Sequence, residues 1–358
     1  MLAAETPLRK AAAGSGRDIM SATDISTTPD HVRKAWKEAH VSPLWEQLAA
    51  HSTEVDRDRP FIWKWQTMRP LIEDALNLQD MAAIQRRVLT LNNPNLRTPS
   101  AMGATPTLTA ALQILKPGES ARPHRHSPNA LRFVLEGEGA YTVVDGKECL
   151  MEEGDLITTP GWTWHEHVHR GHRPIIWLDS LDVPLHRYLG TDGFEPGPPN
   201  KLPPTADDAL FAIANIIPDG IETNSAYSPV FRYPWKQAAA ALSAAPLAKD
   251  GARRVRYVNP MNGGPVMSLI DCYLMELADG ETMPVRSSAS MVCAVVEGSG
   301  TTYAGDDAIS WEPKDVFSLP TGAWVRHRAQ GKARLFVVSD REVLRRLDLL
   351  EEELGGTA

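Results

Sequence analysis

The chain has 358 residues, of which 42% are hydrophobic and 23% are charged, and its net charge is −8. This length allows two domains with substantial cores, and a negative charge without a long basic run argues against a nucleic-acid partner. Three irregularly spaced cysteines suggest no disulfide framework, and no apolar run resembles a membrane span or a signal peptide, so we expect a cytoplasmic protein that binds no membrane.

The N-terminal part has two predicted regions. Residues 1–30 are small, polar and without period, so we expect disorder there, and the sequence does not decide whether translation starts at Met1 or Met20. Residues 31–104 are predicted to form a helical arm that packs on the following domain or on a neighbouring subunit. Its helical spacing covers residues 31–48 with a break at Ser42-Pro43, residues 67–78, and a stretch from about Gln79.

Short strands with turn signals dominate residues 105–193. The run LTAALQIL alternates so that Thr109, Ala111 and Gln113 share one face, and a strong Asp-Gly hairpin signal follows further on. Regular short strands of this kind predict an all-β sandwich or barrel. A polar Gln113 between small residues suits a pocket wall, although the pattern equally allows the solvent face.

Six of the eleven histidines lie between Gly118 and His172. A strand places residues i and i+2 on one face, so two antiparallel strands bring His124, His126 and His165 together on one side of a metal ion. The open positions opposite suit catalysis better than a structural metal site. The alternative is a surface or core-polar pair, which a single His-x-His more often is.

The residues around these histidines match both sequence motifs of the cupin barrel. The glutamate ligand of those motifs is missing, because its position falls at Ala130 or Leu131. With three histidines and no carboxylate, the phrases HRHSPNALRFVLEGEGAYTVVDG and TPGWTWHEHVH closely resemble the gentisate 1,2-dioxygenase family, which has salicylate and 1-hydroxy-2-naphthoate dioxygenases as near relatives. The resemblance covers roughly residues 40–345. The motif positions are Gly118, His124, His126 and Gly137, then Gly154, Pro160, Thr163, Trp164 and His165.

The resemblance implies a chemistry for this site. Imidazoles alone suit Fe, Zn, Cu and Ni, whereas the family implies one Fe(II) per chain and a homotetramer. It also implies a small aromatic carboxylate that binds through its carboxylate and ortho-hydroxyl oxygens, with O2 in an adjacent position. The ring would open between the carboxyl-bearing and hydroxyl-bearing carbons in an extradiol-type cleavage. Because a para-hydroxyl eases the oxidation, the default substrate is gentisate, which would give maleylpyruvate; salicylate and 1-hydroxy-2-naphthoate remain open.

Other side chains near the histidines receive expected roles. Arg132 follows His126 by six residues and is expected to hold the substrate carboxylate, the alternative being an outward arginine in a salt bridge. His167 is expected to move the proton of the substrate hydroxyl. Asp179 is expected to orient His167 or a ligand histidine without binding the metal itself. The remaining expectations concern Arg87 as a second carboxylate contact, Gln113 as the pocket glutamine of the family, Thr109 and Ala111 as small pocket walls, and His169 and His172 as polar loop histidines.

The second half of the chain repeats the first. Residues 194–250 are predicted to be a linker with short helices, since FEPGPPNKLPPTA holds five prolines. In residues 251–340, VVEGSG at 295–300 repeats VLEGEG at 134–139. The fold class is therefore expected to be mainly β, a bicupin with two double-stranded β-helix (jelly-roll) barrels.

The repeat lacks metal ligands. When its glycines are aligned with those of the first barrel, the ligand positions hold Arg286, Ser288 and Val325, none of which suits a transition metal. The second barrel is therefore expected to bind no metal, and His327 to be a leftover surface or interface histidine. Residues 341–358 are predicted to form a charged C-terminal helix and a tail.

Two other classes of function compete with a ring-cleaving dioxygenase. A non-enzymatic storage or sugar-binding bicupin usually has degraded ligand positions in both barrels, whereas one barrel here keeps three histidines. Another cupin enzyme, such as an oxalate decarboxylase or a sugar isomerase, resembles the full pattern with the glutamate that this chain lacks. Metal analysis separates the first alternative from the dioxygenase, and oxygen uptake with gentisate separates the second.

Overall fold

The computed structural model describes residues 28–43, 58–78, 84, 86–97, 102–197, 207–211, 216, 219 and 226–355. The chain divides into two units, residues 1–56 and 57–358. In the first unit, helix α1 (Asp30–Glu38) covers the start of the predicted helical region. The predictions for residues 1–27, for the helix after Pro43 and for most of the stretch after Gln79 lie outside the described residues.

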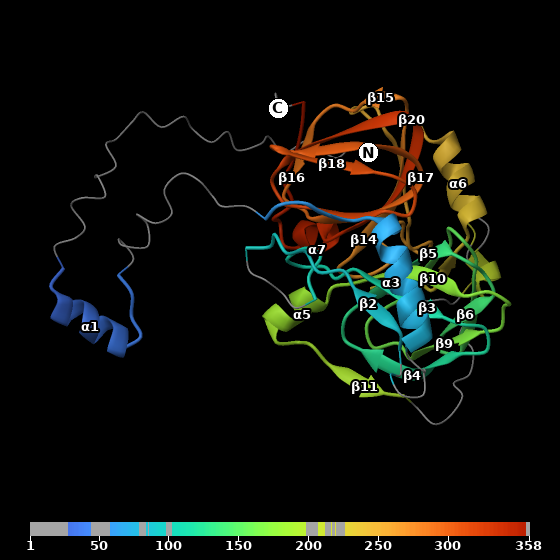
Figure 1. Ribbon diagram of the computed structural model, residues 1–358, viewed down its shortest axis with the longest axis horizontal. Helices are drawn as coiled ribbons and strands as arrows, with labels where there is room; N and C mark the ends of the chain where they lie inside the picture. Colours follow the sequence, from blue (N-terminus) through green and yellow to red (C-terminus); the bar gives the residue numbers. More distant parts are fainter. Residues whose placement is uncertain are drawn as a thin grey trace. The chain divides into compact units, whose positions relative to one another are not determined.

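Two antiparallel sheets form the first barrel, drawn in green in Figure 1. Their strand orders are β12-β8-β5-β10-β3-β2 and β11-β4-β9-β6-β7. Asp145 and Gly146 both have positive φ (44° and 80°) in the turn between β6 and β7, as the Asp-Gly signal predicts. The strands are β2 (Val88–Thr90), β3 (Ala111–Leu115), β4 (Ser120–His126), β5 (Ala130–Glu136), β6 (Ala140–Val144), β7 (Lys147–Met151), β8 (Leu156–Thr159), β9 (His165–His169), β10 (Ile175–Leu181), β11 (Phe194–Pro196) and β12 (Arg232–Tyr233).

The second barrel, drawn mainly in orange and red, is one ten-stranded sheet that curls on itself (Figure 1). Its long strands β17 and β20 pair along most of their length, with register shifts on either side of Glu297. These irregularities bend the pair, so that each strand serves both sides of the barrel. The strands are β1 (Phe61–Trp63), β13 (Arg253–Arg256), β14 (Asp271–Leu277), β15 (Gly280–Glu281), β16 (Val285–Ser287), β17 (Met291–Ala304), β18 (Asp307–Trp311), β19 (Val316–Leu319), β20 (Trp324–Ser339) and β21 (Glu352–Leu354).

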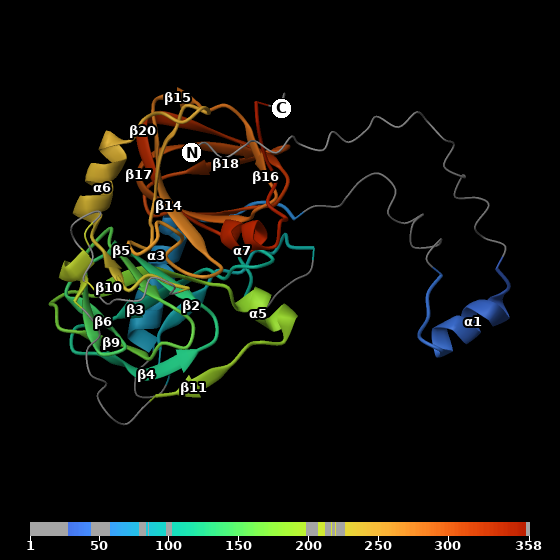
Figure 2. The same ribbon diagram turned by 180° about the vertical axis from the view of Figure 1, so that it is seen from behind.

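Helices cover the outside of the barrels. In both views α6 runs along one side of the second barrel (Figures 1 and 2), where it contacts β13 and β14. No helix in the described part of the chain is long and apolar enough to span a membrane. The helices are α3 (Trp65–Leu78), α5 (Val183–Leu189), the short 3₁₀ helix η2 (Asp208–Phe211), α6 (Trp235–Ala244) and α7 (Arg341–Arg346).

Three segments differ from the sequence-based expectation because each of them pairs with a strand at the edge of a sheet. The predicted C-terminal helix ends at Arg346; the chain then turns through Asp348 (φ 59°) and adds β21 to the edge of β16. Phe194–Pro196, expected in the linker, pairs with β4 instead. Phe61–Trp63, expected in the helical arm, pairs with β19 of the second barrel. Each pairing supplies backbone hydrogen bonds that an exposed edge would otherwise lack.

Hydrophobic side chains form three buried clusters, one inside each barrel and one between the barrels. Alternate residues of each strand point to opposite faces, so β5 contributes Val134 to the interior of its barrel and Phe133 to the contact between barrels. Phe133 stacks on Phe336 of β20, with ring centroids 4.1 Å apart and planes at 8°. This shared core fixes the two barrels against each other, so the interior of each is a separate, pre-formed space.

Candidate metal centre

The structure brings the three predicted ligand histidines together inside the first barrel. β4 and β9 are antiparallel neighbours in which His124 and His165 are direct partners, and His126 lies two residues along the same face. One ring nitrogen of each histidine lies within 4.8 Å of one nitrogen of each of the others. The three side chains are only 2–8% exposed.

Backbone carbonyls orient all three imidazoles in the same way. Nδ1 lies 3.0 Å from Arg122 O in His124, 2.7 Å from Pro128 O in His126 and 3.0 Å from Thr163 O in His165. A carbonyl oxygen only accepts, so Nδ1 carries the proton in each ring and the lone pair lies on Nε2.

A metal ion fits this donor set. In the described part of the chain, the buried Nε2 of His165 has no hydrogen-bond partner, which is costly unless it binds a ligand. Burial lowers the pKa of His124 to about 3 and that of His126 to about 4, and it holds the pKa of His165 well below 6.5. All three rings are therefore neutral near pH 7, the form that binds metals.

No carboxylate joins this group among the described residues. Ala130 and Leu131, at the position of the missing glutamate, are fully buried hydrophobic residues. Asp179 of β10 lies in the barrel but is engaged elsewhere: Oδ1 accepts from Trp177 Nε1 (3.0 Å) and pairs with Arg132 Nε (3.3 Å). The site thus offers three neutral ligands and leaves the charge of a divalent ion uncompensated.

Arg132 lies opposite Asp179 in the register of β5 and β10, and both side chains are more than nine-tenths buried. Arg132 also donates from Nη1 to Thr159 Oγ1. Burial lowers the pKa of Arg132 and raises the pKa of Asp179, because each charged form has lost water. Arg132 is thus neither outward nor exposed, although its salt bridge with Asp179 uses part of its guanidinium.

The second histidine of β9, His167, lies beside the three ligands. It is 1% exposed, its ring centroid is 6.1 Å from that of His165, and its Nδ1 lies 3.0 Å from Thr142 Oγ1. Burial, and then the nearby Arg132, keep the pKa of His167 well below 6.5. His169, expected in a loop, is a buried residue of β9 that accepts from Gly171 N and bonds Arg173 O, so it holds the following turn together.

The three residues expected on one face of the strand at 108–115 have different surroundings. Gln113 is buried, and its Nε2 has no partner among the described residues. Thr109 exchanges hydrogen bonds with the backbone of Leu181, so its hydroxyl is engaged. Ala111 lies opposite Asp179 in the register of β3 and β10, where its small side chain leaves space.

The structure places Arg86, not Arg87, next to the ligands. Arg87 is 2% exposed, forms a bidentate salt bridge with Glu119 (2.7 and 3.0 Å) and donates to Ala75 O, so the expected substrate contact of Arg87 is not supported. Arg86 Nη1 instead lies 2.9 Å from His124 Nε2. The sequence gives no signal for this choice, because it depends on Glu119, a residue distant in the sequence that binds the Arg87 guanidinium.

Arg86 is held at the mouth of the site by an aromatic ring. Its guanidinium lies 5.5 Å from the ring centroid of Phe194, which also stacks on His124. A pocket of about 280 Å³ opens here and is lined by Arg86, His124 and Phe194, among others. Burial lowers the pKa of Arg86, and the attraction of Asp179 offsets this only in part. Arg86 therefore adds a second cationic group beside the histidines.

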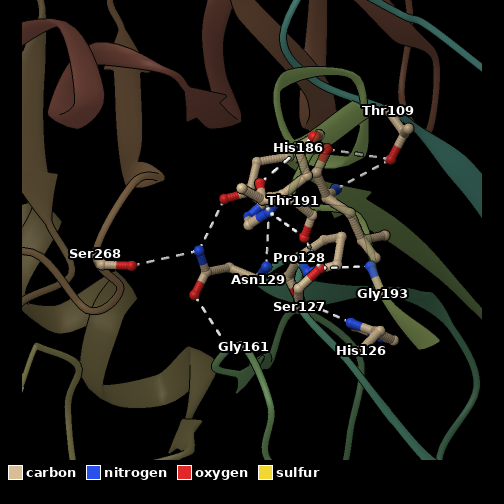
Figure 3. A network of polar contacts seen from close by, with 12 residues as sticks. Thr109, His126, Ser127, Pro128, Asn129, Gly161, His186, Thr191, Gly193 and Ser268 are labelled. Carbon is tan, nitrogen blue, oxygen red and sulfur yellow. Dashed lines mark hydrogen bonds and ion pairs between the residues drawn. The ribbon is translucent and has the colours of Figure 1, made fainter. Parts of the chain in front are cut away.

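A buried amide connects two loops next to the ligand histidines, one after His126 and one before His165 (Figure 3). The side chain of Asn129 donates from Nδ2 to Asp182 Oδ2 (2.7 Å) and accepts from Gly161 N (3.1 Å). Asn129 follows Pro128, whose carbonyl oxygen orients His126, and Gly161 lies in the turn before His165. Asp182 also accepts from the backbone N–H of Asn129 (2.7 Å), so this network holds both loops in one arrangement.

In the second barrel the ligand positions differ from the glycine-based alignment. Val285 is the direct partner of Val325, just as His124 is of His165, and Val285 and Ser287 line the interior. Arg286 instead bonds Gly322 O and Ser288 bonds Leu349 O. A shift of one residue exchanges the faces of a strand, and aligning the glycines introduced such a shift.

The prediction for His327 is wrong. This histidine is 7% exposed and lies inside the second barrel, with Nδ1 2.8 Å from Thr302 Oγ1. Thr302 and His327 are direct partners in β17 and β20, as Thr142 and His167 are in β6 and β9. The second barrel has thus kept the threonine–histidine pair and lost the metal ligands.

Comparisons with known proteins agree with this geometry. Residues 111–181 match the cupin domain family. The chain is 35% identical to gentisate 1,2 dioxygenase 1 of Aquipseudomonas alcaligenes, over 88% of this chain and 93% of that protein, and 35% identical to 5-aminosalicylate 1,2-dioxygenase of Comamonas sp, over 93% and 92%. The crystal structure of salicylate 1,2-dioxygenase from Pseudoaminobacter salicylatoxidans in adducts with gentisate superposes with a TM-score of 0.84 at 30% identity, covering 93% of this chain and 97% of that one. The chain belongs to the gentisate 1,2-dioxygenase family of ring-cleaving bicupin enzymes.

Proposed function

We propose that this enzyme is an Fe(II)-dependent dioxygenase that opens the ring of an aromatic acid with a hydroxyl group ortho to its carboxylate, and that gentisate is its preferred substrate. The observation that carries the proposal is a buried site of three neutral histidines beside two arginines. An anionic, chelating substrate would balance the charge that this site leaves uncompensated. The relatives named for gentisate, 5-aminosalicylate and salicylate support the same substrate class.

We assign one Fe(II) per chain to Nε2 of His124, His126 and His165. When bound there, the ion would supply Lewis-acid and redox chemistry toward the substrate and O2. The protein holds the three rings in a single tautomer through backbone carbonyls and keeps them neutral by burial.

The substrate carboxylate is assigned to Arg86 together with Arg132. Arg132 is already paired with Asp179, whereas the hydrogen bond of Arg86 found among the described residues is to His124 Nε2. If that nitrogen binds metal, Arg86 loses its acceptor and becomes a part-buried cation. An incoming carboxylate would restore both the hydrogen bond and the charge balance. Gln113, Thr109 and Ala111 are assigned to the wall that faces the ring.

His167 is assigned to take up the proton of the substrate hydroxyl at Nε2. The Thr142 hydroxyl donates to Met151 Sδ (3.2 Å), so its oxygen accepts from Nδ1–H of His167. Nε2 is then an unprotonated base. Asp179 positions Arg132 rather than a histidine, because its contacts are to Arg132 and Trp177.

A substrate panel tests the proposal. Protein reconstituted with Fe(II) without oxygen is mixed with aerated gentisate, salicylate or 1-hydroxy-2-naphthoate, and oxygen consumption is recorded with the absorbance of the ring-opened product. We expect one O2 per gentisate consumed and the highest kcat/KM with gentisate. A higher kcat/KM with salicylate or 1-hydroxy-2-naphthoate would overturn the choice of substrate, and no oxygen uptake with any acid would overturn the activity.

We also propose a homotetramer in the cytoplasm. Helix α5 exposes Tyr188 and Leu189 to 88% and 59%, an apolar surface suited to a subunit contact. The three cysteines are buried and unpaired, as suits a reducing compartment. Light scattering that gives the mass of one chain at micromolar concentration would contradict the tetramer.

A further inference from the structure

The interior of the second barrel contains a cavity that the proposed reaction does not use. Its volume is about 460 Å³, within the range of small-molecule sites. Residues of β14, β16, β17, β20 and β21 line it, and β16 and β21 pair with each other. The side chains that matter for its chemistry are Tyr273, Met275, Met291, Cys293, Val325 and His327.

Strand pairing shows how this cavity differs from the metal centre. Cys293 and Val337 are direct partners in β17 and β20, at the register of the Arg132–Asp179 ion pair in β5 and β10. Met275 lies at the register of Gln113. The cavity has therefore replaced an ion pair and an amide by apolar groups, so a carboxylate would find no cation at these positions.

The polar side chains that line this interior include Tyr273, whose hydroxyl donates to Met291 Sδ (3.3 Å), and Ser287, whose hydroxyl accepts from Ala289 N (3.1 Å). His327 adds a ring nitrogen that is available to a ligand. Trp311 Nε1–H donates to Thr302 Oγ1 (2.9 Å), which leaves the Thr302 hydroxyl proton free to bond His327 Nδ1 (2.8 Å). In that arrangement Nε2 of His327 carries a proton. Among the described residues Nε2 has no hydrogen-bond partner, and the side chain is 93% buried and lines the cavity. Burial lowers the pKa of His327 to about 4, so the ring is neutral at pH 7.

The charged residues that line the cavity largely neutralise one another. Arg254 forms a bidentate salt bridge with Asp250 (2.8 and 2.5 Å), and Arg341 forms one with Glu352 (2.9 and 2.7 Å). These two arginines already have carboxylate partners. The lining therefore offers little attraction to an anion, and an uncharged ligand can bind without breaking an ion pair.

We propose that the second barrel binds an uncharged aromatic molecule with one hydrogen-bond acceptor, which receives a hydrogen bond from Nε2 of His327. The thioethers of Met275 and Met291 and the thiol of Cys293 are polarisable groups that contact aromatic rings favourably. The threonine–histidine pair is the part of the first barrel's chemistry that survives here. This site is separate from the metal centre and needs no metal.

The neutral fluorophore Prodan tests this site, because it combines a naphthalene ring with a ketone acceptor and its emission shifts to the blue in apolar surroundings. We expect saturable binding of one Prodan per chain to the iron-loaded enzyme. Val325→Trp fills the cavity and should weaken binding at least about tenfold. His327→Phe keeps the volume but removes the donor, and should weaken binding about three- to tenfold.

Matched variants separate this site from other binding. Arg328→Trp adds the same indole to the exposed face of β20 and should bind Prodan like the unmodified enzyme. His165→Ala, which disables the metal centre, should bind it equally well. Equal binding in Val325→Trp and Arg328→Trp, loss of binding in His165→Ala, or no saturable binding would each overturn the proposal. Near-UV circular dichroism tests whether Val325→Trp is folded. If Val325→Trp is unfolded, Cys293→Phe, which fills the cavity from β17, replaces it and must give the same loss of Prodan binding.

Discussion

The first barrel directs three imidazoles and an arginine–aspartate ion pair into its interior, whereas the second directs Val285, Ser287 and Val325 and the apolar Cys293–Val337 pair into the same places. Both barrels have the same strand pairing, and both keep a buried threonine–histidine pair. The metal ligands and the ion pair are therefore features of the first barrel alone. The strand pairing fixes the direction in which each side chain points. The side chains at a few inward positions decide whether the interior of a barrel can bind a metal and an anion.

The largest expected effect comes from removing a ligand in one barrel but not its counterpart in the other. His165→Ala should lose iron and reduce ring cleavage to the background rate, because two neutral imidazoles remain. Val325→Ala, at the same position of the second barrel, should keep one iron per chain and full activity. Metal analysis and oxygen uptake measure both. Iron retained in His165→Ala would show that other residues form the site.

The paired histidines offer the next comparison. His167→Ala should lower kcat by about 10²–10⁴-fold with a much smaller change in KM, since proton transfer belongs to the chemical step. Iron content should stay near that of the unmodified enzyme, because His167 is not among the three grouped ligands. His327→Ala should leave kcat unchanged. Loss of iron from His167→Ala would instead make His167 a ligand.

Adjacent arginines test the assignment of the carboxylate site. Arg86→Gln should raise KM for gentisate, with a loss in kcat/KM of about 30- to several-thousand-fold, because a charged contact of this kind contributes roughly 2–5 kcal/mol. Arg132→Ala should act in the same direction. Arg87→Gln should instead lower the melting temperature through the loss of the Glu119 salt bridge, with KM unchanged. A large KM effect in Arg87→Gln, with none in Arg86→Gln, would reverse the assignment.

The smallest expected effect is on the pH dependence of folding stability, through His327 of the second barrel. The pKa of His327 is about 4 in the folded state and near 6.5 in the unfolded chain, so the unfolded chain binds more protons between these values and stability falls as pH falls through this window. At pH 4.5 this costs about 2–3 kcal/mol relative to pH 7. His327→Gln should therefore lose less stability on acidification, as urea unfolding at the two pH values would show. Equal losses would contradict the burial of His327 in solution. The exposed His172→Gln is the control.

Local rules were sufficient to predict the core of the metal centre. The two-residue period of a strand and the spacing between the two histidine clusters identify His124, His126 and His165, and the absence of a carboxylate at Ala130 and Leu131 is visible in the letters themselves. The repeated glycine phrases likewise predict two barrels. Such features depend on neighbours within a few residues, so the sequence carries them directly.

Other features depend on contacts between distant segments, and these the sequence did not determine. Arg86 rather than Arg87 reaches His124, because Glu119, 32 residues along the chain from Arg87, takes the Arg87 guanidinium. The inward residues of β16 and the burial of His327 follow from cross-strand register, and aligning glycines misplaced the former by one position. Part of the C-terminal segment forms the strand β21 instead of the predicted helix because it pairs with the edge of β16. The face of a strand on which a side chain lies follows from the local sequence. Its interaction partner depends on which strand or charged group the tertiary fold places beside it.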